Sequence, residues 1–303
     1  MTAAVVRETI AGVPSSSHRD GRVGNRQRAE RARREWRLVA PEWTRRAPEI
    51  ERQSQPMTDA LLAHADIRPG DRVLELAAGP GGLGEILCAL VGPRGAVVVT
   101  DVSPEMVSAA SERMPRLPNL RIEVRDMCAI DEPDASFDVV VCRMGLPFAG
   151  DTASALREIR RVLRPGGRFA AVTCGPAEDN PWLTCVIDAL ATAGVLPPVR
   201  DEQPAISRSS VDGLTTLAAA CGFVGVCVEA VPLELTASSI DEHFDRITAL
   251  AAGLQEAIRR AAPAAIESAR AVAGTLAAPH AASGGVALPG LALVVAARRA
   301  TER

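Results

Sequence analysis

The stretch from Val73 to Gly84, VLELAAGPGGLG, constrains the fold of this chain more than any other. Val73, Leu74 and Leu76 form a short apolar run typical of a strand buried in a parallel sheet, and the helix-like segment GEILCALV begins at Gly84. The glycines between them allow a tight turn and let a ligand approach the backbone closely. The sequence therefore predicts a strand, a glycine turn and a helix that together bind a nucleotide-like ligand.

Two acidic residues narrow the choice of ligand. Asp101 ends the next apolar run, where a second parallel strand should finish, and its carboxylate can accept hydrogen bonds from both ribose hydroxyls. Glu75 places negative charge beside the turn, where it would repel a pyrophosphate and attract an ammonium group. A cofactor with adenosine at one end and an amino acid at the other, S-adenosylmethionine, suits both acids. The spacing of Gly79, Gly81 and Gly84 also fits NAD, so a nicotinamide oxidoreductase is the alternative.

At this point the sequence resembles the class I S-adenosylmethionine-dependent methyltransferases. Their first motif, an acid followed by alternating glycines, is matched by Glu75, Ala77, Gly79 and Gly81. Ala77 stands in place of the usual first glycine. The resemblance continues in order through VVTDVSPEMV, IEVRDMCAI, FDVVVCRMGLPF and LREIRRVLRPGGRFAAV. It extends from about residue 36 to 299, within the branch that includes ubiquinone and menaquinone methyltransferases and many bacterial natural-product methyltransferases.

This resemblance implies a Rossmann-like, doubly wound α/β fold. Its sheet is expected to have seven mostly parallel strands with an antiparallel last strand, joined by N-terminal and C-terminal helical cap segments. The implied divisions are a disordered tail at 1–24, a helical cap at 25–68, the cofactor-binding core at 69–236, a helical cap insertion at 237–284, and the final strand and tail at 285–303. Two further expectations are one continuous helix at 49–65 and a loop or lid segment at 197–210.

The resemblance also implies a role for each strand end. Val102 and Met106 would flank the adenine ring, and the alternative for Met106 is core filling. Asp126 would accept a hydrogen bond from the adenine amine, while the backbone N–H of Met127 meets a ring nitrogen. The carbonyl of Cys142 would lie near the cofactor amino group. No histidine or paired-cysteine spacing supports Cys142 as a nucleophile or metal ligand.

Candidates for contact with the methyl acceptor come from several segments. The resemblance implies that Arg143 and Met144, which follow the fourth strand, lie near the acceptor. Trp36, Trp43 and Trp182 are candidate pocket walls in a chain with only 3% aromatic residues. Ordinary packing of a helix pair explains the first two tryptophans equally well.

His243 is the candidate proton acceptor, because a histidine can remove a proton near neutral pH. It lies in the alanine-rich insertion where the resembling family builds part of its acceptor cap. The alternative is a partly exposed helix histidine without a catalytic role. Asp241 and Glu242 are weaker candidates in the same part of the chain, and His280, in a loop near the last strand, is a candidate pocket residue.

Composition excludes several classes of chemistry and partner. The chain of 303 residues has no tyrosine, and all its basic residues other than histidine are arginine, which excludes a lysine Schiff base and a Walker-type lysine. A net charge of −3 gives no overall attraction to nucleic acid, and the arginine-rich run at 25–38 reads as a solvated helix face diluted by Glu30 and Glu35. Irregularly spaced cysteines, no secretory signal and no bilayer-length apolar run predict a cytoplasmic location without membrane insertion.

The expected function is methyl transfer from S-adenosylmethionine to a small, apolar natural-product or quinone-like acceptor, at carbon, oxygen or nitrogen. The displacement would be in line and would need no metal. A role in bacterial secondary metabolism is expected, and the presence of a homo-oligomer is left open. The alternatives are a protein that binds the cofactor without transferring methyl, as an accessory protein or non-methylating catalyst, and the NAD-dependent oxidoreductase.

Overall fold

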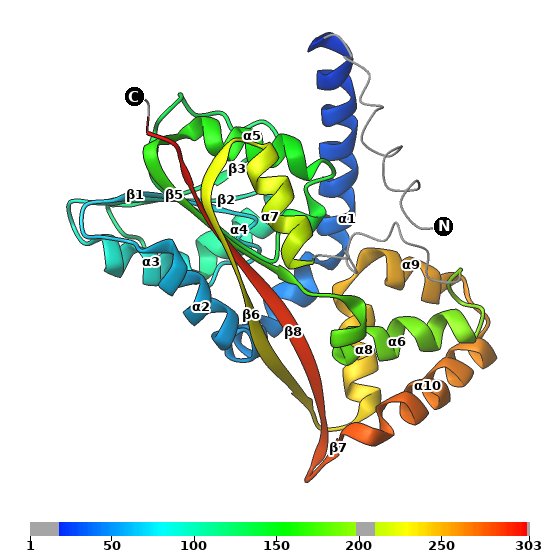
Figure 1. Ribbon diagram of the computed structural model, residues 1–303. Helices are drawn as coiled ribbons and strands as arrows, with labels where there is room; N and C mark the ends of the chain where they lie inside the picture. Colours follow the sequence, from blue (N-terminus) through cyan, green and yellow to red (C-terminus); the bar gives the residue numbers. More distant parts are fainter. Residues whose placement is uncertain (1–17, 198–209, 302–303) are drawn as a thin grey trace, which may run out of the picture.

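The computed structural model describes residues 18–197 and 210–301, and these form a sheet flanked by helices (Figure 1). Within these residues the strand order is β3-β2-β1-β4-β5-β8-β6, and a short β7 also pairs with β8. The strands are β1 (Arg72–Leu76), β2 (Ala96–Asp101), β3 (Leu120–Val124), β4 (Phe137–Arg143), β5 (Leu163–Cys174), β6 (Phe223–Ala237), β7 (Ala281–Ala282) and β8 (Gly285–Arg299).

Pairing along this sheet confirms the predicted Rossmann-like, mostly parallel architecture with an antiparallel last strand. The pairs that join β1 to β2, β1 to β4, β2 to β3 and β4 to β5 are all parallel. Strand β8 lies antiparallel to both β5 and β6. The carboxyl ends of β1 to β5 therefore meet at one edge of the sheet, where ligands bind in folds of this kind.

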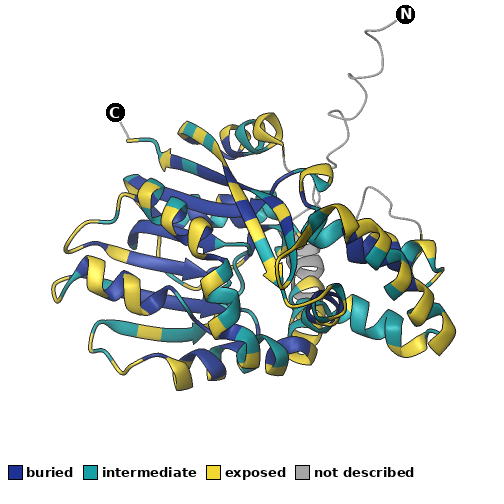
Figure 2. Cartoon of the chain, turned by 90° about the horizontal axis from the view of Figure 1, so that it is seen from below, coloured by how far each residue is buried: buried dark blue, intermediate teal, exposed yellow. Residues whose placement is uncertain are grey.

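Helices cover both faces of the sheet because alternate residues of each strand point to opposite sides. The helices are α1 (His18–Gln53), α2 (Gln55–Ala65), α3 (Gly84–Val91), α4 (Pro104–Arg113), α5 (Thr152–Val162), α6 (Pro181–Thr192), α7 (Val211–Ala220), α8 (Ile240–Leu250), α9 (Ala252–Arg260) and α10 (Pro263–Ala277). One apolar core joins α2, α3 and α4 to Val73 and its neighbours, and a second joins α5 and α7 to Leu74 and its neighbours. Figure 2 shows the buried strands between helices whose outer surfaces are exposed.

A third apolar core forms beside the sheet from α6, α8 and α10, with Val186, Phe244 and Ala273 among its buried side chains. Figure 1 shows these helices next to the long ribbon of β6 and β8. Helices α8, α9 and α10 come from the predicted cap insertion, whereas α6 comes from the segment assigned to the core. This helical unit is therefore built from two separate parts of the chain.

Two predicted boundaries need correction, and a third predicted segment lies mostly outside the described residues. Residues 18–24 belong to α1, although a disordered tail was expected there; residues 1–17 lie outside the described part of the chain. The single helix predicted at 49–65 is divided at Ser54, because α1 ends at Gln53 and α2 begins with Pro56 in its first turn, where a missing N–H costs nothing. Most of the expected lid at 197–210 also falls outside the described residues.

Candidate functional site

The glycine turn after β1 is built on left-handed backbone. Ala77, Gly79 and Gly81 have φ values of 53°, 59° and 83°. Glycine adopts this conformation freely, whereas alanine at Ala77 is strained by about 1 kcal/mol or more. The Gly79 N–H donates to Asp101 Oδ2 at 2.9 Å, and the Ala78 N–H donates to the Thr100 carbonyl at 3.0 Å. The end of β2 therefore fixes the shape of the turn.

The exit of β4 lies directly against this turn. A Cβ placed on Gly145 would lie 2.3 Å from the Cβ of Ala77 and 2.8 Å from Cys142 Sγ. It would also lie 3.5 Å from the Met127 side chain, which follows β3. Gly145 is thus required by close approach, since its own φ of −92° suits any residue. The structure brings the ends of β1, β3 and β4 together around Gly145.

Glu75 is a buried carboxyl group beside the turn. It is 3% exposed, and its Oε2 has no hydrogen-bond partner within the described residues. Burial raises the pKa of Glu75 to about 8; Arg143 opposes this rise, while Glu51 and Asp101 add to it. A buried carboxyl oxygen without a partner is unfavourable unless a donor or cation reaches it. The site therefore fits the ammonium group of an amino-acid ligand.

Asp101 is also buried, and each of its oxygens accepts one backbone hydrogen bond. Oδ1 accepts from the Ser103 N–H at 2.9 Å, and Oδ2 accepts from Gly79. Burial raises the pKa of Asp101, and these backbone N–H groups oppose the rise. A carboxylate oxygen can accept more than one bond, so both can still accept from ribose hydroxyls. Asp101 thus fixes the shape of the glycine turn and can still accept hydrogen bonds from a ligand.

The remaining predicted cofactor residues lie at or near the same edge. Val102 is half-buried directly after β2, while Met106 is 1% exposed within α4. Asp126 is half-buried after β3 and accepts from the Cys128 N–H at 2.9 Å. Cys142 is fully buried, and burial raises the pKa of its thiol to about 12, which argues against a nucleophilic role. The predicted contacts of these residues with a cofactor stay predictions.

Two of the three candidate tryptophans join an aromatic cluster consisting of Trp36, Trp43 and Phe148. The ring of Trp36 lies 5.1 Å from that of Phe148 and 6.0 Å from that of Trp43, both in edge-to-face geometry. Trp43 also donates its Nε1–H to the Leu250 carbonyl at 2.9 Å, which joins α1 to the end of α8. Phe148 was not among the candidates, although it closes the FDVVVCRMGLPF segment. Within this cluster, Phe148 lies three residues beyond Gly145, shortly after the end of β4.

Trp182 lies in a different setting. Its indole packs on Gly290 of β8, where a Cβ would lie 2.5 Å from Trp182 Cδ1, and its Nε1–H donates to Asn180 Oδ1 at 2.8 Å. Trp182 also packs against the apolar core of α6, α8 and α10. These contacts favour a structural role for this tryptophan.

His243 is fully buried, so the alternative of a partly exposed helix histidine is wrong. Its Nε2 donates to the Trp182 carbonyl at 2.5 Å, and its Nδ1 accepts from Arg246 Nη2 at 2.8 Å. Burial lowers the pKa of His243 to about 4, with a further contribution from Arg246. Both ring nitrogens are engaged by protein groups. His243 therefore offers no free lone pair to an acceptor in this structure.

Arg143 lies at the end of β4 and is paired with a residue that sequence reasoning missed. Its Nη2 donates to Glu51 Oε1 and Oε2 at 2.8 and 3.0 Å, and its Nη1 donates to Thr58 Oγ1 at 2.7 Å. Glu51 belongs to α1, in a run of alternating charges that carries no signal of a site. Met144, the next residue, has a left-handed φ of 62° and donates its N–H to the Val172 carbonyl.

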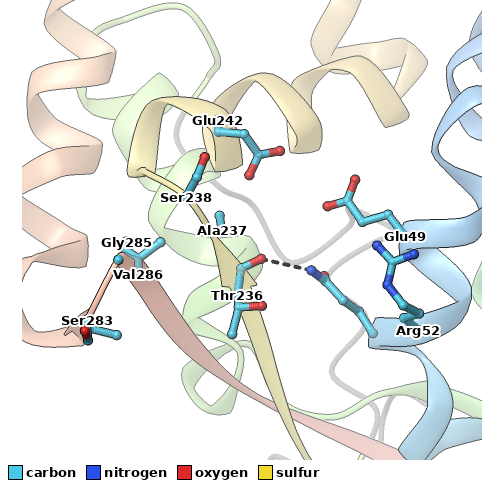
Figure 3. Close-up of a pocket in the computed structure, with 12 residues that line it drawn as sticks. Glu49, Arg52, Thr236, Ala237, Ser238, Glu242, Ser283, Gly285 and Val286 are labelled. Atoms are coloured by element: carbon cyan, nitrogen blue, oxygen red, sulfur yellow. Dashed lines mark hydrogen bonds between the residues drawn. The ribbon is translucent and has the colours of Figure 1, made fainter.

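A surface hollow of about 460 Å³ lies near the end of α1 (Figure 3). Glu49 and Arg52 of α1, Thr236 of β6 and Glu242 of α8 contribute to its wall, together with the turn between β7 and β8. Gln53 Nε2 donates to the Thr236 carbonyl at 2.9 Å across it. No residue of the glycine turn lines this hollow, so it is separate from the cluster around Gly145.

Two further observations concern the described residues as a set. Among them no three or more His, Cys, Asp or Glu side chains are grouped so that they could hold a metal ion. In the same part of the chain, every helix is too short or too polar to cross a membrane.

Residues 73–167 match a methyltransferase domain family. Among curated proteins, the chain is 35% identical over 125 residues to the ubiquinone/menaquinone biosynthesis C-methyltransferase UbiE of Ectopseudomonas mendocina, which covers 40% of this chain and 48% of that protein. The chain thus spans about half the length of this relative.

Solved structures share the fold at low identity. The YcgJ protein of Bacillus subtilis has a TM-score of 0.54 and 19% identity, covering 82% of this chain and 99% of that one. The [4+2]-cyclase SpnF has a TM-score of 0.52 and 21% identity, covering 81% of this chain and 80% of that one. Residues 73–167, which carry the glycine turn and its two acids, thus resemble a methyltransferase domain, and the solved structures share the fold of this chain.

Proposed function

We propose that this protein transfers the methyl group of S-adenosylmethionine to a small, flat and apolar acceptor, of the quinone-like or aromatic natural-product type. The observation that carries the proposal is the buried Glu75, whose unpartnered oxygen lies beside a left-handed glycine turn closed by Asp101. Bound S-adenosylmethionine would supply a methyl group that its sulfonium already makes electrophilic. The protein then mainly has to position the two reactants and exclude water.

Each residue at the sheet edge receives a role in holding the cofactor. Glu75 would bind its ammonium group, and Asp101 would accept from the ribose hydroxyls while keeping its bond to Gly79. Asp126 and the N–H of Met127 would hold the adenine. In this arrangement the amino-acid end of the cofactor lies near the exit of β4.

The aromatic cluster of Trp36, Trp43 and Phe148 supports an acceptor with a flat apolar ring. It unites α1 with the segment after β4, beside the place where the methyl group is expected. Flat rings pack favourably on aromatic side chains, and such contacts also exclude water. The relative from Ectopseudomonas mendocina is named for C-methylation in quinone biosynthesis, which agrees with this class of acceptor. His243 takes no part in the proposal, because both its nitrogens are engaged.

Calorimetric titration with S-adenosylmethionine, S-adenosylhomocysteine and NAD tests the cofactor. We expect the first two to bind and NAD to give no response. Asp101→Asn should weaken S-adenosylmethionine binding by about 1–3 kcal/mol, because a charge-assisted hydrogen bond is lost. The exposed Asp212→Asn on α7 is the matched control and should bind as the unmodified protein does. Binding of NAD alone would overturn the proposal.

Transfer itself needs a second measurement. Protein is incubated with S-adenosylmethionine carrying a labelled methyl group and a panel of hydroquinones and phenols, and labelled product is followed with S-adenosylhomocysteine. Trp36→Ala should reduce product formation by about tenfold or more without weakening cofactor binding, since the aromatic contact would be made with the acceptor. Tight cofactor binding without any turnover across the panel would favour a non-methylating role.

A further inference from the structure

The end of α1 reaches into the glycine turn. A Cβ placed on Gly82 would lie 2.0 Å from Glu51 Oε1 and 2.6 Å from Glu51 Oε2. The carboxylate of Glu51 therefore rests directly on the backbone of the turn. Absent side chains in such turns are what allow a ligand to approach the backbone. A protein carboxylate thus lies where part of a bound ligand would be expected.

Arg143 holds this carboxylate in place. Its Nη2 contacts both oxygens of Glu51, while its Nη1 is anchored on Thr58, a residue of α2 that is only 2% exposed. The side chains of Arg143 and Glu51 are 13% and 29% exposed. The guanidinium is therefore fixed to the body of the protein, whereas its partner lies at the end of a helix that belongs to the cap.

Charge around the turn is arranged for a ligand with two ends. Glu75, with its unpartnered oxygen, suits a cationic group, and Arg143 is close enough to lower the pKa of that carboxyl. The guanidinium of Arg143 suits an anionic group, and in this structure that group is the carboxylate of Glu51. The α-amino acid end of S-adenosylmethionine carries an ammonium and a carboxylate on one carbon, so it can satisfy both residues at once.

We infer that Arg143 binds the α-carboxylate of the cofactor, and that Glu51 occupies this position in the ligand-free protein until the cofactor displaces it. The inference rests on the proposed function, and it reassigns Arg143 from the acceptor to the cofactor. One carboxylate replaces another on the same guanidinium, so no charge is left unpaired on Arg143. Displacement would remove one contact of α1, the helix that also carries Trp36 and Trp43 of the aromatic cluster.

Two ligands that differ only in the carboxylate test the inference: S-adenosylmethionine and decarboxylated S-adenosylmethionine, titrated by calorimetry. Arg143→Gln should weaken S-adenosylmethionine binding by about 10- to 100-fold, as expected for a lost charged hydrogen bond, and change binding of the decarboxylated ligand by less than about threefold. Glu51→Gln should strengthen S-adenosylmethionine binding by about two- to fivefold, because the internal competitor has gone. It should strengthen binding of the decarboxylated ligand less, because that ligand gains only from the easier ionisation of Glu75.

Control measurements distinguish failure of the inference from failure of the proposed function. Glu229→Gln on β6, whose side chain is 59% exposed, should leave both affinities unchanged. If Arg143→Gln weakens binding of both ligands equally, or if Glu51→Gln weakens binding of S-adenosylmethionine, the Arg143–Glu51 pair only stabilises the structure of the site. The inference is then wrong. Should Arg143→Gln not fold, the difference between the effects of Glu51→Gln on the two ligands decides alone, and equal effects would overturn the inference. Failure of the unmodified protein to bind S-adenosylmethionine would instead overturn the proposed function.

Discussion

Replacing Glu75 by glutamine should make the free protein more stable at pH 8 and weaken its binding of the cofactor. Both effects have one cause. Burial, together with Glu51 and Asp101, raises the pKa of Glu75 from 4.5 to about 8, so ionisation of this group is costly in the folded protein. The protein retains an unfavourable group that becomes useful only when a cation binds to it.

The size of the effect follows from the pKa. One unit corresponds to about 1.4 kcal/mol, so the rise from 4.5 to about 8 corresponds to about 5 kcal/mol. Below pH 4.5 Glu75 is protonated in both states and costs nothing. Between pH 4.5 and 8 only the unfolded state loses the proton, so the free energy of unfolding falls as the pH rises, and it levels off above pH 8. An unbonded buried amide costs about 1–3 kcal/mol, which leaves a net gain of about 2–4 kcal/mol for Glu75→Gln at pH 8.

Urea unfolding at pH 5 and pH 8 measures the first effect as the difference between variant and unmodified protein. The gain should appear at pH 8 and vanish or change sign at pH 5, where ionisation of Glu75 costs only about 0.7 kcal/mol. Glu85→Gln, which changes an exposed acid in the first turn of α3, is the matched control.

Calorimetry measures the second effect. An ammonium ligand requires ionised Glu75, so its binding below pH 8 should release a proton, and its affinity should rise by up to about tenfold per pH unit between pH 5 and 8. Titrations in two buffers with different ionisation enthalpies count this proton, which the variant should not release. A variant that is less stable at pH 8, or a binding reaction that releases no proton, would refute the reasoning.

Three further predictions concern stability and are checked by chemical unfolding. Gly145→Ala should cost about 1–3 kcal/mol through its contact with Ala77, and Ala77→Gly in the same chain should recover part of that loss; full additivity of the two changes would contradict this. Because burial lowers the pKa of His243 from 6.5 to about 4, His243 should lower the free energy of unfolding by about 3 kcal/mol as the pH falls from 6.5 to 4, opposite in sign to the contribution of Glu75, and His243→Gln should remove that contribution; a variant with an unchanged pH profile would contradict this. Asp71→Asn should cost about 3 kcal/mol, because it removes the nearest carboxylate from Arg168, which is 4% exposed; a loss below about 1 kcal/mol would mean that the pair is unimportant.

Local sequence patterns predicted the sheet and the edge at which the candidate site lies. Apolar runs such as the one before Glu75 identify buried parallel strands, and an acid at the end of such a run identifies the edge where a ligand binds. These signals are short in range, which is why Glu75, Asp101 and the glycine turn could be named before the fold was known. Local patterns could not predict that α6 belongs with α8 and α10, because these helices are joined only through packing.

The surroundings of the candidate acceptor residues could not be predicted from the sequence, because they come from distant segments. His243 lies in a helix that reads as amphipathic, yet its burial depends on Trp182 from another part of the chain. Trp36 and Trp182 are equally scarce aromatics in the sequence. Only packing separates the first, next to Phe148, from the second, on Gly290.

The sequence by itself therefore determined the strand, turn and helix around Gly79 and the acids that follow the strands, because backbone sterics and hydrophobic periodicity act between near neighbours. Tertiary structure alone decided which side chains meet across the site. Arg143 and Glu51 are 92 residues apart, and no local pattern links them. Their contact arises because α1 crosses the sheet edge where β4 ends, and side chains from separate elements pair only once the core has brought those elements together.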